Sequence, residues 1–491
     1  MIQREQWDSR TAFVLAAIGS AIGLGNIWRF PYVCYQNGGG AFLVAMLVAL
    51  FTAGIPLLIL EFSLGHKMQG AAPHAFFKVN KRFQWFGWMA MLVGFFICCY
   101  YAIIMSYSFN FAIASFTEAW GDNPSEYFYT TTLGLTDSPL TLGSFKPMIF
   151  LGLLVCWVCI TLSTWRGAKT VSKVVYFTVI IPWLLLVVFI IRGVTLPGAV
   201  EGLNFYLTPD FAKLKEPQVW LAAYTQVFFS LSVGFGIMIA YGSFLPQKTD
   251  IVNNAFIVGL SDTLTAFMGG LAVFGALGFH AHSLGKPVAD VAAAGPGLAF
   301  VIYPTIISNL PFWQPLFGVL FFVMLLTLGI DSAFSMTESV SASIKDRWKL
   351  KHRTANLSVG VAGFLFGLPL VFGAGLLWLD IVDRFMTQFG LMLVCLGEAI
   401  IIGWYYGSGK MRGYVNDLSE MRINWLWDAG VRFILPVATV VLLVWEIVKR
   451  IESSYKGYPR IAEFFGGWLV VILLPILGLV LAAIKVKENR K

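Results

Sequence analysis

Twelve apolar stretches, each about as long as the helix that crosses a bilayer, dominate this 491-residue sequence. A spanning helix takes about 20 residues, and lipid offers no hydrogen-bond partners to irregular backbone, so only helices fit here. Charged residues make up 12% of the chain, about half the share usual in soluble domains. The sequence predicts an all-α membrane protein with twelve transmembrane helices near residues 11–36, 40–64, 86–116, 147–163, 172–191, 219–244, 252–280, 315–343, 355–372, 376–406, 430–448 and 464–485.

The basic residues predict how the chain lies in the membrane. Most of the 34 lysines and arginines fall in loops and ends that share one side, with five in 345–353, whereas the long loop 117–146 on the other side holds only Lys146. Cytoplasmic loops carry such an excess, so both termini are expected in the cytoplasm of a multi-pass cell-membrane protein. The basic residues form no single patch, which argues against a nucleic-acid partner. The start of the chain lacks the pattern of a cleavable signal peptide.

The cysteines and histidines give little support to an enzyme. All six cysteines lie in apolar segments and are expected to be small core residues, without a metal or redox role. A membrane enzyme would need a nucleophile with a base, or a set of metal ligands, and the five histidines lie near helix ends or in loops. A channel would need a continuous polar stripe, whereas the polar groups described next gather at one depth. We therefore expect a transporter and not an enzyme.

Two of the predicted helices carry glycines beside polar residues in mid-membrane. The first contains Gly-Ser-Ala-Ile-Gly-Leu-Gly-Asn at 19–26, and the sixth contains Ser-Leu-Ser-Val-Gly-Phe-Gly at 230–236. Glycine inside a helix costs about 1 kcal/mol relative to alanine, so both helices are expected to be broken. Interrupted helices at matching positions of two halves indicate an inverted repeat with a binding site at the midplane. The alternative is that these glycines only allow close helix packing.

Carboxylates inside predicted helices are the next signal. Asp262 and Asp331 lie within the seventh and eighth, and Glu61 and Glu398 lie near the ends of the second and tenth. A carboxylate at bilayer depth costs a few kcal/mol and therefore faces a partner, a cavity or an ion. Oxygen atoms from the broken backbone, with these aspartates, are ligands that a hard cation such as sodium prefers. The alternative is a structural cap or a buried ion pair, which we favour for Glu61 and Glu398.

The broken helix ends also suit a zwitterion. Free N–H groups attract a carboxylate and free carbonyl groups attract an ammonium group. Tyr101, in the middle of the third helix, can donate its hydroxyl group to that carboxylate, or it can bond between helices instead.

These motifs resemble the sodium-coupled neurotransmitter symporters, the family that includes the bacterial leucine transporter. The first-helix signature is Gly-Leu-Gly-Asn-Ile-Trp-Arg-Phe-Pro-Tyr at 23–32, followed by Asn-Gly-Gly-Gly-Ala-Phe at 37–42. Segments 228–236 and 328–332, with Tyr100-Tyr101, resemble the sixth, eighth and third helices, so the likeness spans the chain. It implies a 5+5 inverted repeat with broken helices one and six. The rule about paired broken helices was drawn partly from this family, so that match is not independent support.

The resemblance also implies how the chain and its sites are divided. A single transporter domain, 1–491, would hold a first repeat (1–191), a second repeat (192–410) and two peripheral helices (411–491). The implied first sodium site is Ala21, Asn26, Ser230 and Asp262, and the second is Gly19, Ile22, Leu328, Asp331 and Ser332. The implied substrate pocket is Ala21, Gly25, Ile97, Tyr101, Phe229, Ser232, Phe235, Ser332 and Met336. The implied outer gate is Arg29 with Asp383, and the inner gate is Arg4 with Asp346, beside Trp7.

Three departures from the family pattern narrow the function. Chloride-binding members have a neutral residue, a tyrosine and a serine where this chain has Asp262, Met46 and Ala266, so no chloride is expected. Members that carry biogenic amines have an aspartate where this chain has Gly23. The loop 117–146 lacks a cysteine pair and a glycosylation site, which is typical of bacterial rather than animal members.

The expected function is therefore sodium-coupled import of a small zwitterion by alternating access. Two sodium ions are expected to travel with a neutral apolar L-amino acid, because Ile97, Phe229, Phe235 and Met336 would line an apolar side-chain pocket. An ω-amino or sulfonate zwitterion such as taurine is the alternative substrate. The sequence leaves the oligomeric state open.

Overall fold

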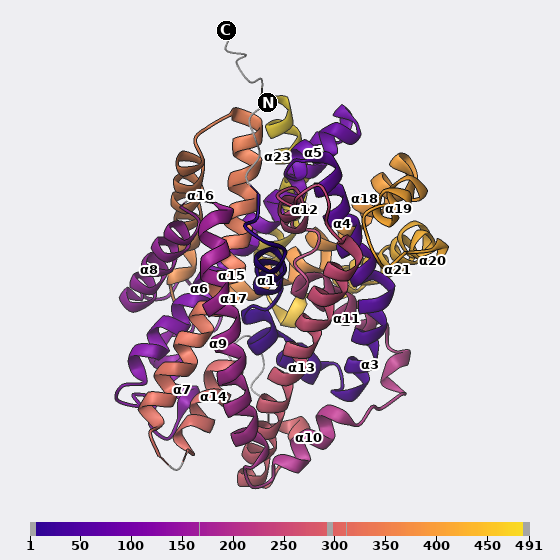
Figure 1. The fold of residues 1–491 in the computed structure, drawn as a ribbon. Coiled ribbons are helices and arrows are strands. Elements are labelled where there is room, and N and C mark those ends of the chain that lie inside the picture. The colour runs from indigo at the N-terminus through magenta and orange to yellow at the C-terminus, as the bar shows by residue number, and fades with distance from the viewer. Residues whose placement is uncertain (1–5, 166, 292–297, 311, 485–491) are drawn as a thin grey trace.

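The computed structural model describes residues 6–165, 167–291, 298–310 and 312–484, and most of these residues are helical (Figure 1). All twelve predicted segments fall on a helix or a broken helix. In chain order the segments are α1 with α2 (Arg10–Ala21, Phe30–Gln36), α3 with α4 (Gly40–Ala49, Ile55–Met68), α6 (Gln84–Ala114), α8 (Pro147–Ser163), α9 (Ala168–Val194), α11 with α12 (Pro217–Ser230, Ile237–Gly242), α13 (Ile251–Leu284), α15 (Gln314–Trp348), α16 (His352–Gly367), α17 to α19 (Gly375–Phe385, Met392–Glu398, Ser408–Asn416), α20 with α21 (Trp425–Ala429, Leu435–Glu452) and α22 with α23 (Arg460–Glu463, Leu469–Ala483).

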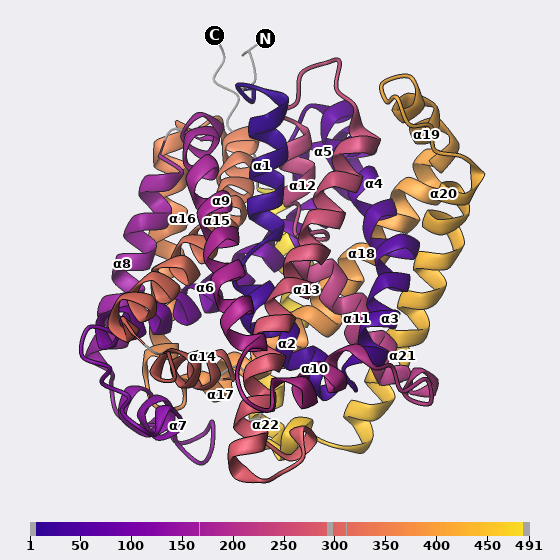
Figure 2. The ribbon, with the colours of Figure 1, turned by 60° about the horizontal axis from the view of Figure 1, so that its bottom comes forward.

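Length and composition support a multi-pass membrane protein. Within the described residues, eight helices are long and apolar enough to cross a bilayer, or ten if each of two bent pairs counts as one span. The first bent pair joins α1 to the segment ending with α2, at 41°. The second joins the end of α9 to α10 (Ala199–Leu207) at 113°, so α10 turns away from the bundle axis and lies across one end of it (Figure 2).

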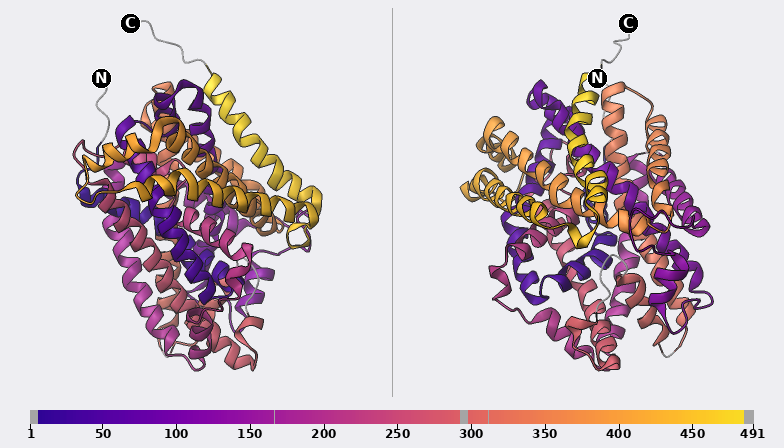
Figure 3. Two further views of the ribbon diagram at one scale, coloured as in Figure 1. Left: turned by 90° about the vertical axis from the view of Figure 1, so that its right-hand side faces the viewer. Right: turned by 180° about the vertical axis from the view of Figure 1, so that it is seen from behind.

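Three short helices complete the loops. The helix α5 (Ala72–Val79) lies at the end of the molecule where α1 begins and α23 ends, and α7 (Pro124–Glu126) and α14 (Leu298–Ser308) lie toward the opposite end (Figure 2). The start of α1 and the end of α23 share one side, as an even number of crossings requires (Figure 3).

The broken helix α1 lies at the centre of the bundle, where it packs against α9, α13 and α15. Next to it, α6 and α15 pack along much of their lengths. The outer helices leave large apolar side chains exposed, among them Leu184 on α9, Leu264 on α13 and Val441 on α21. An exposed apolar surface of this kind is what a lipid-facing helix presents. Glycines let the inner helices approach: a Cβ atom at Gly65 of α4 would overlap the carbonyl oxygen of Ile239 on α12.

This close approach gives a prediction for stability. Gly65→Ala should lower the unfolding temperature of the purified protein, because the new methyl group must displace the α12 backbone, and overpacking of this kind costs about 1–3 kcal/mol. The matched control is Gly413→Ala on α19, where nothing lies within 4 Å of the added Cβ atom. That change should be neutral or stabilising by up to about 1 kcal/mol. Equal unfolding temperatures for the two variants would contradict the α4–α12 packing.

Candidate functional site

The break in the first helix follows Ala21, where α1 ends. Two backbone N–H groups after the break bond to side chains and not to helix carbonyl groups. That of Gly23 donates to Oδ1 of Asn26 at 3.3 Å, and that of Leu24 donates to the hydroxyl oxygen of Tyr101 at 2.7 Å. The carbonyl oxygen of Ser20 accepts hydrogen bonds from the hydroxyl groups of Ser232 at 3.0 Å and Ser332 at 3.1 Å. The glycine-rich run therefore forms a true break, as the sequence predicted.

The sixth helix breaks between Ser230, the last residue of α11, and Ile237, the first of α12. Ser232, Gly234 and Gly236 all have positive φ, which no helix accommodates. At Gly234 (φ +78°), a Cβ atom would also lie 2.9 Å from the sulfur of Cys395. The free N–H of Gly234 donates to Oε1 of Glu61 at 2.6 Å.

Glu61 is therefore a structural cap, as favoured from the sequence. It lies on α4 and is fully buried, and the carboxyl group of Glu398 on α18 lies beside it. Glu61 thus serves the broken sixth helix, and neither glutamate belongs to the sodium sites predicted from the sequence.

The two breaks face each other across one small cavity of about 20 Å³. All nine predicted substrate-pocket residues line it, together with three that the sequence analysis did not include: Ser20, Gly23 and Ser230. Aromatic and aliphatic side chains from α6, α11 and α15 form one part of the wall, and the broken backbone forms the rest. The cavity therefore combines an apolar wall with polar groups from the helix ends, although its role in binding remains a prediction.

Three of the four residues predicted for the first sodium site are hydrogen-bonded to one another. Nδ2 of Asn26 donates to Oδ1 of Asp262 at 2.7 Å, and the hydroxyl group of Ser230 donates to the same oxygen at 2.8 Å. All three side chains are buried, and the fourth residue, Ala21, lines the cavity beside Ser230. This arrangement gathers carboxylate, amide and hydroxyl oxygens where α13 meets both breaks.

Asp331, the central residue predicted for the second sodium site, is buried completely within α15. Neither of its carboxylate oxygens has a hydrogen-bond partner among the described residues, and its polar neighbour is the hydroxyl group of Thr178 on α9. The carboxylate faces Gly19 so closely that a Cβ atom there would lie 3.3 Å from Oδ2. A buried unpaired carboxylate costs several kcal/mol, so the arrangement is compatible with the predicted cation site, which stays a prediction. The carbonyl groups of Ile22 and Leu328 stay predicted ligands.

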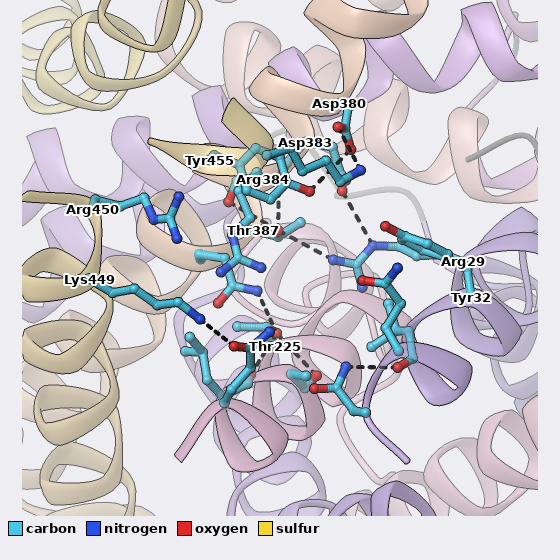
Figure 4. Close-up of a pocket in the computed structure, with 18 of the residues that line it drawn as sticks. Arg29, Tyr32, Thr225, Asp380, Asp383, Arg384, Thr387, Lys449, Arg450 and Tyr455 are labelled. Carbon is cyan, nitrogen blue, oxygen red and sulfur yellow. Dashed lines mark hydrogen bonds and ion pairs between the residues drawn. The ribbon is translucent and has the colours of Figure 1, made fainter. Parts of the chain in front are cut away.

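The two residues predicted to form the outer gate lie close together beside the cavity. Nε of Arg29 lies 3.6 Å from Oδ2 of Asp383, and the Arg29 guanidinium lies 4.6 Å above the ring of Phe229, which lines the cavity. Arg29 also donates to Gln226 and to Thr387. Beyond Arg29 a larger outer cavity of about 340 Å³ opens, and Figure 4 shows Arg29 and Asp383 within it.

The predicted inner gate is only partly described. Arg4 lies outside the described residues. Trp7 is buried, its indole N–H donates to the carbonyl oxygen of Tyr241 at 3.1 Å, and its ring packs on Tyr241 and Phe244. Asp346 accepts a hydrogen bond from the backbone N–H of Ala71 at 2.9 Å. Trp7 thus ties the start of the chain to the α12 segment of the broken sixth helix.

The sequence analysis missed the residues that line the outer cavity from the far end of the chain. Lys449 and Arg450 of α21, with Tyr455 and Lys456 of the following loop, lie beside α17 and the gate pair. The signal was a group of basic residues on the side of the membrane that generally carries few of them. The six cysteines form no disulfide, and no group of three or more potential metal-ligating His, Cys, Asp or Glu side chains occurs in the part of the chain that the structure describes.

Known proteins resemble this chain over nearly its whole length. An uncharacterised sodium-dependent transporter of Methanocaldococcus jannaschii is 38% identical over 99% of this chain and 98% of its own. The sodium- and chloride-dependent GABA transporter 2 of Mus musculus is 33% identical over 96% of this chain and 85% of its own. The crystal structure of MhsT in complex with L-phenylalanine matches with a TM-score of 0.80 at 31% identity, over 90% of this chain and 99% of that one.

A family model described as the sodium:neurotransmitter symporter family matches residues 4–124 and 119–488. The match covers both breaks, the buried aspartates and the gate pair. With the shared fold of MhsT and the extent of these matches, the chain belongs to the sodium:neurotransmitter symporter family.

Proposed function

We propose that this protein couples the inward flow of sodium ions to the uptake of a small zwitterion, a neutral apolar L-amino acid, by alternating access. The observation that carries the proposal is Asp331, a buried carboxylate that has no cationic side chain paired with it among the described residues and faces the broken first helix at Gly19. A cation bound there compensates the charge and satisfies the free backbone oxygens of the break. The Asn26–Asp262–Ser230 cluster offers a second cation position beside the cavity.

The broken helices also support a substrate that carries its own carboxylate. A Cβ atom at Gly23 would overlap the hydroxyl oxygen of Ser332 and lie 2.6 Å from that of Tyr101. No acidic side chain fits at position 23, so the pocket has no carboxylate there for a bare amine. Tyr101 accepts a hydrogen bond from Leu24, which leaves its proton to donate to a substrate carboxylate. L-phenylalanine, the ligand named for MhsT, is an apolar amino acid that carries its own carboxylate. The similarity to the GABA transporters supports the alternative substrate, an ω-amino acid.

The closed gate supports alternating access over a channel. In this structure Arg29 pairs with Asp383 and lies over Phe229 of the cavity wall, so the cavity has side chains across its outer side, as a site reached by alternating access would. We place the protein in a bacterial cell membrane with both termini on the cytoplasmic side, because α1 begins and α23 ends on the side that carries most of the basic loops. Two sodium ions entering with a neutral substrate gain about 4.6 kcal/mol per 100 mV, over a thousandfold in concentration at about 1.4 kcal/mol per decade.

Sodium dependence tests the central proposal. Proteoliposomes with an inward sodium gradient should accumulate at least one member of a panel of labelled neutral amino acids, and potassium in place of sodium should abolish accumulation. Asp331→Ala should lose it too, because the cation loses its carboxylate ligand. The matched control is Glu452→Gln, an exposed carboxylate on α21, which should transport normally. Accumulation of the same substrate at full rate without sodium would rule out symport.

Chloride independence tests the role given to Asp262. Two sodium ions held close together repel strongly in a low-dielectric site and need nearby negative charge. Oδ1 of Asp262 accepts two hydrogen bonds, as an ionised carboxylate does, and that charge would repel a bound anion. Buried Met46 and Ala266 offer no hydroxyl donors to chloride.

Uptake should therefore be the same when gluconate replaces chloride, and Asp262→Ser should be impaired or should gain chloride dependence. The competing account is that Asp262 is protonated and only donates a hydrogen bond. A native protein that stops transporting in gluconate would show that Asp262 does not supply this charge.

Tyr101→Phe tests recognition of the substrate carboxylate. Loss of a hydrogen bond to a charged group costs about 1.5–3 kcal/mol, so KM for the transported amino acid should rise about tenfold or more. The control is Tyr107→Phe on the same helix α6, a buried hydroxyl group without a partner among the described residues, which should leave KM unchanged. Equal KM values for native protein and Tyr101→Phe would remove Tyr101 from the substrate site.

A further inference from the structure

Two glutamates meet inside the bundle beside the broken sixth helix. Glu61 on α4 and Glu398 on α18 are both fully buried, and their carboxyl groups face each other within hydrogen-bond reach. They lie against the break, since a Cβ atom at Gly234 would come within 2.9 Å of the sulfur of Cys395, about one helical turn before Glu398. Neither glutamate belongs to the predicted sodium sites, so the reason for burying two acids together lies elsewhere.

The two carboxyl groups differ in the hydrogen-bond donors around them. Oε1 of Glu61 accepts the backbone N–H of Gly234 at 2.6 Å, and the backbone N–H of Ile239 on α12 also bonds to this carboxyl group. Oε2 of Glu61 and both oxygens of Glu398 have no donor among the described residues. Glu61 therefore has donors that stabilise a negative charge, and Glu398 has none.

No cationic side chain compensates this pair. Within the described part of the chain, no lysine, arginine or histidine pairs with either glutamate, and the other titratable group that lies against them is the thiol of Cys395. Two carboxylates side by side in a low-dielectric interior repel each other strongly, and each buried charge is costly. One proton removes the repulsion and one of the two charges, and it supplies the donor that the remaining carboxylate lacks.

We propose that the Glu61–Glu398 pair is a proton-binding site, in which the carboxylic acid of Glu398 donates a hydrogen bond to Oε2 of Glu61 and the pair keeps one negative charge. A hydrogen bond between a carboxylic acid and a carboxylate is short and strong. Through this bond, α18 holds the carboxylate that accepts from Gly234, so the proton is part of what fixes the sixth-helix break. The competing occupant is a monovalent metal cation between two ionised carboxylates, which the experiment distinguishes.

Infrared spectroscopy of the purified full-length protein at neutral pH detects this proton, because the C=O stretch of a protonated carboxyl group absorbs apart from that of a carboxylate. The native protein should show a protonated-carboxyl band that shifts when the glutamates are isotope-labelled at the carboxyl carbon, which separates it from any aspartate band. The band should be lost in Glu398→Gln. The matched control is Glu452→Gln, which removes an exposed carboxylate on α21 and should keep the band.

Stability separates the donated proton from simple packing. Glu398→Gln should unfold near the native temperature, because its amide N–H donates to Glu61 in place of the acid O–H. Glu398→Leu introduces a side chain of similar size without a donor. It leaves Oε2 of Glu61 buried without a partner and should therefore unfold at a lower temperature.

The proposal is overturned if the native protein shows no protonated-glutamate band, or if the band persists in Glu398→Gln. A metal cation in place of the proton would give no such band, and the unfolding temperature would then depend on which monovalent cation is supplied. If Glu398→Gln does not fold, the isotope-labelled native protein still decides. Equal unfolding temperatures for Glu398→Gln and Glu398→Leu would contradict the donor role. None of these measurements uses a substrate or a transport assay, so their outcome is independent of the proposed symport.

Discussion

Unpaired backbone groups in the middle of the bundle determine which side chains must surround the two broken helices. Both the first and the sixth helix stop and restart at bilayer depth, where no water satisfies the freed N–H and carbonyl groups. Four side chains from three other helices satisfy part of them: Tyr101 accepts from Leu24, Glu61 accepts from Gly234, Ser332 donates to Ser20, and Ser339 donates to Gly236. The groups left over, with the carboxylate of Asp331, line the place where we propose that ions and a zwitterion bind. The fold thus fixes the unpaired backbone groups in position, and the proposed ligands would pair with those that no side chain satisfies.

The sequence predicted most of this fold because a membrane reduces the choices. Apolar length located twelve segments, each of which falls on a helix or a broken helix, and glycine beside serine and asparagine located both breaks, since glycine weakens a helix and the polar residues can bond the freed backbone groups. Hydropathy also exposed Asp262 and Asp331 as charges that need an explanation. The assignment of Ile97 or Met336 to the pocket came instead from the family likeness, because period and composition do not show which face of a fully buried helix meets a cavity. Their clustering around one cavity agrees with that likeness.

Other features lay beyond sequence reasoning for physical reasons. Hydropathy marks the segments of α20 to α23 as ordinary spans, and the family likeness places them at the edge of the bundle. Neither indicates that Lys449 and Arg450, at the end of α21, line the outer cavity. The need for glycine at position 23 depends on Ser332 and Tyr101, which are distant in the chain and meet only in the folded bundle. Charge pairs such as Arg384 with Glu446 likewise join segments whose relative rotation no local pattern encodes.

Asp380 and Asp383 lie about one turn apart on α17 and have different bonding partners. Asp383 lies 3.6 Å from the Arg29 guanidinium and accepts a hydrogen bond from the Tyr100 hydroxyl group, whereas Asp380 is held by an ammonium group and two phenol groups from the loop that leads into the last helix. Asp380 therefore attaches α17 to the loop between the last two helices. If Arg29 and Asp383 form the outer gate, the carboxylate side of that gate is therefore held to the last two helices through its neighbour Asp380, although these helices lie outside the predicted repeats.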